Sequence, residues 1–172
     1  FYGNGWYGNL SAFYRNGQNI IDWTQACDTC DLIAGNTTRV DFGGLEFSLR
    51  KSLSADATLA GLQFFEMGYS YLSNFSPEDP EIYRSLYVFD FLRHKLSLRA
   101  AQKLGERLKI HYFLSYQVRE GQYRDAQLAK LIDYPEVWLL NASLNYDWRD
   151  FQFSLKAQNL LNRRYFDRGN VE

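Results

Sequence analysis

The chain has 172 residues, a length that fits one ordinary domain, and a formal net charge of −1. So balanced a charge gives no general attraction to nucleic acid or to anionic lipid. No apolar run approaches the roughly 18 residues that a transmembrane helix needs. Hydrophobic residues make up 46% of the chain, yet its mean hydropathy is −0.41, because apolar and polar residues are interleaved.

The ends of the chain look like those of an excised segment. The only methionine is Met67, so there is no initiator Met, and no signal peptide precedes Phe1. We therefore expect the chain to be a piece of a longer protein.

Apolar and polar residues alternate with period two along most of the chain, which predicts about seven β-strands. In each strand the apolar side chains share one face and the polar side chains share the other. The predicted strands lie near residues 7–15, 39–50, 57–72, 87–101, 107–119, 137–148 and 151–158.

The apolar faces of these strands carry no Asp, Glu, Lys or Arg, and His94 is their only ionisable residue. An Arg or Lys that faces lipid costs about 2–4 kcal/mol at mid-bilayer, so a membrane barrel explains this absence. A soluble antiparallel sheet also alternates, and alternation alone does not say which face is inside.

Connection lengths and aromatic residues favour the membrane barrel. The connections after the first, third and fifth strands are long, and those after the second, fourth and sixth are short, as in outer-membrane barrels. Aromatic residues gather at both ends of the apolar faces, which predicts two girdles. Those near the long loops are Tyr14, Tyr69, Tyr71, Tyr116 and Trp138, and those near the short turns are Trp6, Tyr146, Trp148 and Phe151.

We therefore predict an all-β fold: an antiparallel meander of about seven strands that forms part of a large transmembrane β-barrel. The polar face is rich in Arg, Lys, Asn, Gln and Ser, and so many long side chains suit a wide lumen better than a narrow one.

Four stretches carry a resemblance to a known family. "NLLNRRYFD" resembles the N-L-F-N/D-x-x-Y segment near the C-terminus of TonB-dependent outer-membrane receptors. "YRNGQNIIDW" resembles a strand-to-loop segment of the same receptors, which include vitamin B12 and siderophore transporters. "GGLEFSLR" resembles their recurring G-x-E strand opening, and "YVFDFLRHKLSL" resembles another of their strands. The likeness covers most of the chain.

The resemblance implies that residues 1–172 are a C-terminal portion of the barrel, corresponding to strands fifteen to twenty-one of twenty-two. The plug domain and the closing strand are then absent. It also implies the outer membrane of a Gram-negative bacterium, surrounding lipid, and active import of a scarce small-molecule ligand such as a metal chelate, cobalamin or a glycan. The energy would come through TonB, acting on the plug. No cofactor and no enzymatic step are expected.

Cys27 and Cys30 form a C-x-x-C pair, which can be a redox pair, half of a zinc site or a local disulfide. No second C-x-x-C and no nearby His complete a zinc site, and we favour a local disulfide or a free pair. We expect no metal site.

The candidate ligand-binding residues lie in the long loops and on the polar face. Trp23, Asp28 and Asp31 share the longest connection, where they either contact a ligand or form a solvated loop edge. Arg93 and Arg119 face the lumen by parity, where they either attract an anionic ligand or pair with carboxylates.

Two other kinds of protein stay open at this point. One is a small self-contained outer-membrane barrel that acts as a pore or as an enzyme, for example a hydrolase that uses His111 with a Ser from a neighbouring strand. The other is a soluble β-barrel that binds a ligand and buries its apolar face.

Overall fold

The computed structural model describes residues 2–53, 61–76, 81–85, 90–125 and 130–165, and it contains only strands, turns and irregular segments. None of these segments is a helix long and apolar enough to cross a membrane. The strands are β1 (Tyr2–Gly3), β2 (Trp6–Gln25), β3 (Ile33–Ser52), β4 (Leu62–Asn74), β5 (Arg84–Ser85), β6 (Phe91–Leu104), β7 (Leu108–Glu120), β8 (Gln122–Asp125), β9 (Lys130–Asp133), β10 (Val137–Trp148) and β11 (Phe151–Ala157).

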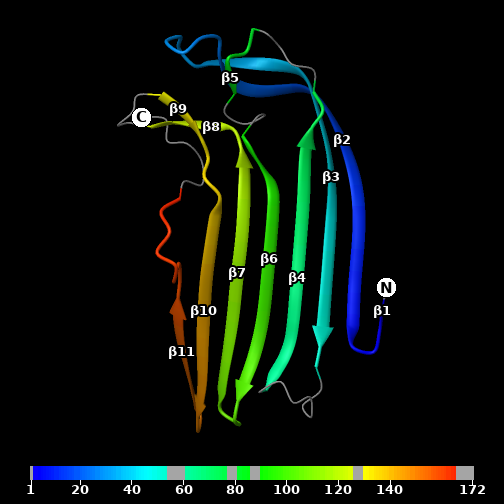
Figure 1. Ribbon diagram of the computed structural model, residues 1–172, viewed down its shortest axis with the longest axis vertical. Helices are drawn as coiled ribbons and strands as arrows, with labels where there is room; N and C mark the ends of the chain where they lie inside the picture. Colours follow the sequence, from blue (N-terminus) through cyan, green and yellow to red (C-terminus); the bar gives the residue numbers. More distant parts are fainter. Residues whose placement is uncertain (1, 54–60, 77–80, 86–89, 126–129, 166–172) are drawn as a thin grey trace.

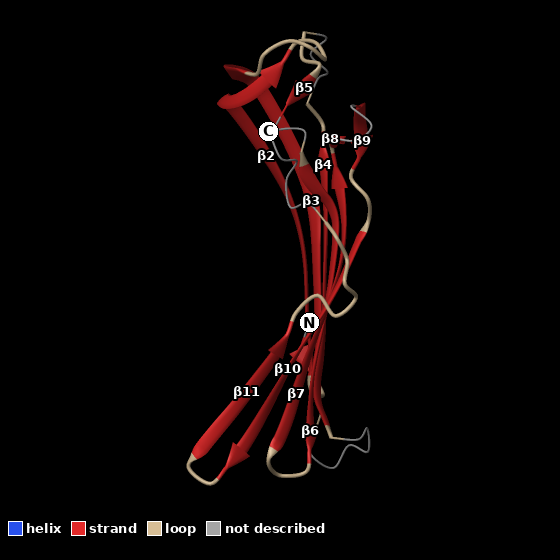
Figure 2. Cartoon of the chain, turned by 90° about the vertical axis from the view of Figure 1, so that its left-hand side faces the viewer, coloured by secondary structure: helices blue, strands red, loops and turns tan. Residues whose placement is uncertain are grey.

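The seven long strands and the two-residue β1 form one antiparallel meander in the order β1-β2-β3-β4-β6-β7-β10-β11, as Figure 1 shows. Seven of these eight strands correspond to the seven predicted from the sequence, and the all-β meander is confirmed. The first residues of the predicted strands 57–72 and 87–101 lie outside the described residues. Figure 2 shows the sheet from its edge, strongly twisted, with the upper parts of β2 and β3 bending away.

The connection predicted after the first strand is mostly not a loop. β2 and β3 pair from Trp6↔Lys51 up to Thr24↔Ile33, which leaves only residues 26–32 as the turn. The β-branched residues Ile20 and Ile21 support this extension. The connection after the fifth strand likewise contains the β8–β9 hairpin.

Register places the apolar residues in continuous rows across the sheet, because directly paired residues point to the same face. One row runs Leu10, Phe47, Tyr69, Leu96, Tyr116 and Trp138, and the next runs Gly8, Leu49, Met67, Leu98, Leu114 and Leu140. Trp138 and Trp148 stand ten residues apart on β10. At about 3.3 Å per residue and a tilt of about 40°, this separation is roughly 25 Å, the height of a barrel's apolar band.

Two positions depart from the predicted alternation. A bulge between Leu92 and His94 shifts the register of β6, so Leu92 pairs with Arg119 and lies on the polar face instead of the apolar one. Lys51 falls on an apolar row at its lower end, where its ammonium lies 4.9 Å from the ring centre of Trp6.

Candidate functional site

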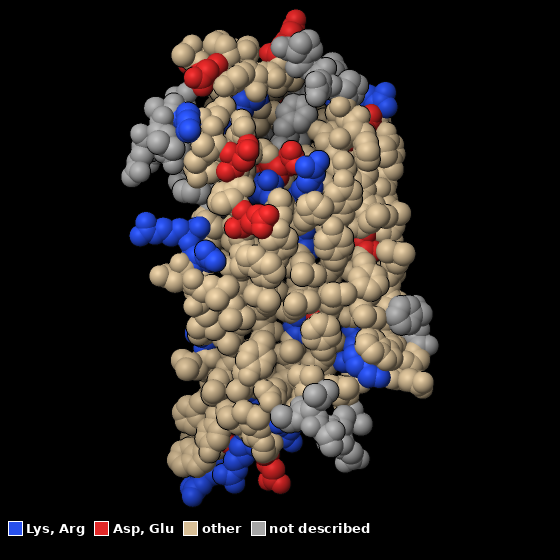
Figure 3. All heavy atoms as spheres, viewed as in Figure 1, with Lys and Arg blue, Asp and Glu red and all other residues tan. Residues whose placement is uncertain are grey.

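The upper ends of β4, β6 and β7 meet the hairpin β8–β9 and the short strand β5 around a hollow of about 770 Å³. Figure 3 shows that charged side chains gather near this end and at the lower tips, while other residues dominate the middle of that face. The lining residues are Ser73, Asn74, Ser76, Tyr83, Arg84, Ser85, Phe91, Arg93, Arg119, Glu120, Gly121, Gln122, Leu131 and Asp133. We call this hollow the mouth cavity.

One wall of the mouth cavity is built around an enclosed ion pair. Arg119 Nη1 lies 2.6 Å from Asp90 Oδ1, and both side chains are largely buried. The hydroxyl of Tyr134 donates a hydrogen bond of 2.9 Å to the other carboxylate oxygen of Asp90. The guanidinium of Arg119 also lies 5.7 Å from the ring centre of Tyr134. Asp90 compensates the charge of Arg119, and Asp90 and Tyr134 together fix the orientation of the Arg119 side chain.

The other charged residues of this wall are paired as well. Arg93 Nη1 lies 2.9 Å from Glu120 Oε2 in a half-exposed ion pair. Gln122 Nε2 donates a hydrogen bond of 2.8 Å to Asp133 Oδ1 across the β8–β9 hairpin. The wall therefore presents two ion pairs and one amide–carboxylate pair of fixed geometry.

The opposite wall is carried by β5, which pairs with the far end of β2 through Thr24↔Ser85 and Gln25↔Arg84. Asp22 is fully buried there and accepts hydrogen bonds from the Ser85 hydroxyl and from the Trp23 backbone N–H, the latter at 2.7 Å. A buried carboxylate needs such donors to offset its lost hydration. The contact holds the segment from Tyr83 to Ser85 against the mouth cavity.

Asp41 fixes the edge of the cavity that lies beside β4. Its carboxylate accepts hydrogen bonds from Asn16 at 2.5 Å and from Arg39 at 2.6 Å, and its backbone N–H donates to Ser76 Oγ at 2.8 Å. Burial acts to raise the pKa of Asp41, but the hydrogen bonds from Asn16, Tyr14 and Arg39 outweigh burial and lower the pKa.

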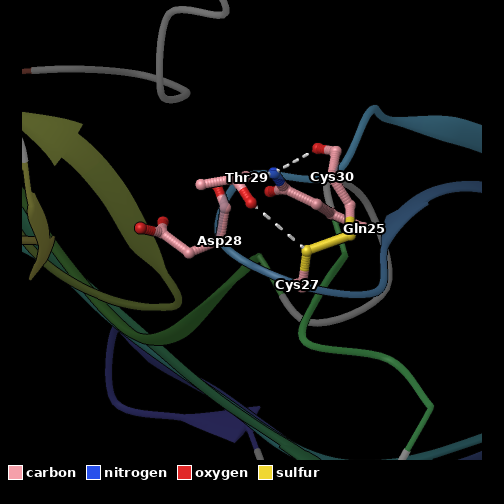
Figure 4. The surroundings of a disulfide bond; sticks show 5 residues. All are labelled: Gln25, Cys27, Asp28, Thr29 and Cys30. Carbon is pink, nitrogen blue, oxygen red and sulfur yellow. Dashed lines mark hydrogen bonds between the residues drawn. A yellow bond between two sulfur atoms is a disulfide. The ribbon is translucent and has the colours of Figure 1, made fainter.

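The tip of the β2–β3 hairpin holds a second set of contacts, which Figure 4 shows. Cys27 and Cys30 form a disulfide. Gln25 Nε2 donates hydrogen bonds to the backbone carbonyls of Asp28 at 3.2 Å and of Cys30 at 2.7 Å. The disulfide closes the turn into a small covalent loop, and the two hydrogen bonds from Gln25 hold that loop against the end of β2.

The structure brings together only two of the five candidate ligand-binding residues. Arg93 and Arg119 both line the mouth cavity, and each is paired with a carboxylate. Trp23, Asp28 and Asp31 are exposed on the hairpin and do not line it. Among the described residues, no group of three or more His, Cys, Asp or Glu side chains is placed to hold a metal ion.

Further ion pairs lie on the polar face below the mouth. Glu66 lies between Arg50 and Arg99, at 3.3 Å and 3.5 Å. His111 lines a separate hollow of about 400 Å³ and is paired in register with Ser143. His94 lies on the apolar face, where its Nδ1 shares a hydrogen bond of 2.8 Å with the Tyr69 hydroxyl.

Sequence reasoning missed the residues that organise the mouth cavity. Asp90 and Tyr134 lie 44 positions apart, and Asp22 and Ser85 lie 63 apart. One available signal was Asp90, an acidic residue at the start of a predicted strand whose lumenal positions carry Arg. Ser85 had no comparable signal, because a two-residue strand shows no periodicity.

The chain was compared with protein families, curated proteins and solved structures. The model of the TonB-dependent receptor-like β-barrel matches residues 1–160, while no curated protein and no solved structure matches. The match confirms the family predicted from "NLLNRRYFD" and the other three stretches. The chain therefore belongs to the β-barrel family of TonB-dependent receptors, a class of proteins of the Gram-negative outer membrane.

Proposed function

We propose that the chain forms part of the barrel wall and the outer mouth of a receptor that imports a scarce small-molecule ligand across the outer membrane. The family is one of transport proteins. The observation that carries the proposal is the mouth cavity, because five strand ends and loops converge on one polar hollow of about 770 Å³. Ligand pockets of roughly 300–1,000 Å³ are typical of small-molecule sites.

The proposal includes a larger assembly than the chain itself. The lumenal face carries rows of charged and amide side chains, which suit a wide polar interior of the kind found in large barrels. Residues 1–172 would then be a C-terminal portion of such a barrel. A plug inside it would contact TonB and so receive energy from the inner membrane.

Uptake by cells tests this function. Three labelled probes are supplied at limiting concentration: a ferric catecholate chelate, cyanocobalamin and a mixture of neutral oligosaccharides. The host strain is compared with strains that lack the full-length receptor or lack TonB. We expect one probe to accumulate only when both proteins are present. If no probe depends on both, the import function is wrong.

A further inference from the structure

The charges of the mouth cavity sum to zero when Asp90 is counted, with Arg84, Arg93 and Arg119 against Asp90, Glu120 and Asp133, and this restricts the ligands that it can take. Arg119 is paired with Asp90 and Arg93 with Glu120, so neither guanidinium offers an uncompensated charge. Asp133 is hydrogen-bonded to Gln122. An anionic ligand would have to displace these carboxylates or lie beside them, and juxtaposed like charges are strongly unfavourable.

The remaining lining groups suit a neutral ligand with many hydroxyls. Ser73 and Asn74 place short neutral polar groups around one side of the hollow, beside Ser76 and Ser85, whose hydroxyls already donate to Asn74 and to Asp22. Arg84 forms no ion pair with any described residue, and its planar guanidinium can donate to hydroxyl oxygens. Such groups form hydrogen bonds with hydroxyls and do not require the ligand to carry a charge.

Aromatic surface completes this arrangement. Tyr83 lines the cavity with about half of its surface exposed, and Phe91 lines the same hollow, edge-to-face against Phe42 at 5.2 Å. A flat ring beside polar groups fits a molecule that has one apolar C–H face and a rim of hydroxyls. A sugar ring has this form.

We propose that the ligand held at the mouth cavity is a neutral oligosaccharide, an inference that rests on the import function proposed above. Tyr83 stacks on a sugar ring, and the Arg93–Glu120 and Gln122–Asp133 pairs receive and donate hydrogen bonds at its hydroxyls. The anchoring of β5 by Asp22 keeps Tyr83 in place for this contact.

The sharpest test is a substitution that changes the binding of the two ligand types in opposite directions. Glu120→Gln removes the partner of Arg93 and leaves that guanidinium uncompensated. In the full-length receptor in detergent, calorimetry would measure the binding of neutral oligosaccharides, the ferric catecholate chelate and cyanocobalamin. We expect an oligosaccharide to bind and Glu120→Gln to weaken it about tenfold, because a charge-assisted hydrogen bond at a fixed geometry is lost.

A second variant tests stacking. Tyr83→Ala is expected to weaken oligosaccharide binding about tenfold. Tyr146→Ala is the control, since Tyr146 is also a partly exposed tyrosine but lies near the end of β10 that is far from the mouth cavity, and this substitution should leave affinity unchanged. Raising the salt from 50 to 500 mM should change the affinity of the neutral ligand by less than about twofold, whereas the affinity of an anionic ligand falls.

Two outcomes overturn the ligand class. One is that no oligosaccharide binds. The other is that the ferric chelate binds and binds more tightly after Glu120→Gln, which would show that the cavity is built for anions. TonB-dependent uptake of the chelate or of cyanocobalamin would then still support the import function, so the two proposals fail separately.

Discussion

The assignment of faces makes a quantitative prediction at the middle of the apolar band. Ala142 pairs with Tyr112 and Ala157 on the apolar face, and the next residue, Ser143, points to the lumen, opposite His111. We expect Ala142→Arg to destabilise the barrel strongly and Ser143→Arg to be tolerated, although the two substitutions introduce the same side chain one position apart.

The expected destabilisation by Ala142→Arg follows from the depth of Ala142 in the apolar band. Ala142 lies four residues from Trp138 and six from Trp148, which is about 10 Å below the upper girdle and about 15 Å above the lower one. This position is close to the middle of a band of roughly 25 Å, where Arg costs about 2–4 kcal/mol. A loss of about 3 kcal/mol lowers the folding equilibrium constant roughly a hundredfold.

The lumenal control has room for its added side chain. Ser143 lines the hollow of about 400 Å³ together with His111 and Lys156. Repulsion from Lys156 at an exposed site is worth only a few tenths of a kcal/mol, so about 0.5 kcal/mol is the expected limit. The assay is denaturant unfolding of the full-length receptor in phosphatidylcholine vesicles, followed by tryptophan fluorescence. Equal losses for the two variants, or a larger loss for Ser143→Arg, would refute the assignment of faces.

Three further predictions concern the outer end of the strands. Asp90→Asn should cost about 2–3 kcal/mol, because it leaves the largely buried Arg119 without its counter-ion, and thermal unfolding would measure the loss. Replacing Cys27 and Cys30 by Ser should leave global unfolding nearly unchanged but speed cleavage of the hairpin tip in limited proteolysis, since the closed loop is short. The pKa of Asp41 in the folded protein lies below its usual value of 3.8, so this carboxylate stabilises the fold above pH 3.8 and the stabilisation is lost as the pH falls through the folded pKa. Hydrogen exchange near β3 should therefore rise in acid for the wild type and not for Asp41→Asn.

The sequence predicts the membrane-spanning wall well because its signal is local. Each strand alternates with period two, and lipid imposes the same rule on every apolar face. Leu114 and Leu140, for example, are assigned to the apolar face from their own strands alone, and the structure pairs them directly. The failure at Leu92 is also local in origin, because a bulge inserts one residue and reverses the parity beyond it.

The mouth could not be predicted in the same way, because its contacts join segments that have no periodicity. The connection at 16–38 looks like a loop in the sequence, with Asn, Gly, Gln and Asp in it. The structure continues β2 and β3 through it, since pairing between the two strands satisfies the backbone and outweighs the turn propensity of those residues. Asp22 lies in this same connection, and the structure buries it fully against Ser85.

This contrast indicates where receptors of one family can differ. The wall is constrained at every second residue by lipid, so a substitution there is limited by a cost of several kcal/mol whatever the ligand. The contacts of the mouth carry no such repeated constraint. Arg93 and Glu120, or Gln122 and Asp133, are single pairs on neighbouring strand ends, and exchanging one partner changes the charge of the cavity without disturbing the apolar rows below. If the proposed import function holds, we therefore expect ligand specificity to depend on a few paired residues at the strand ends, whereas the apolar rows between the girdles are shared by barrels of the family.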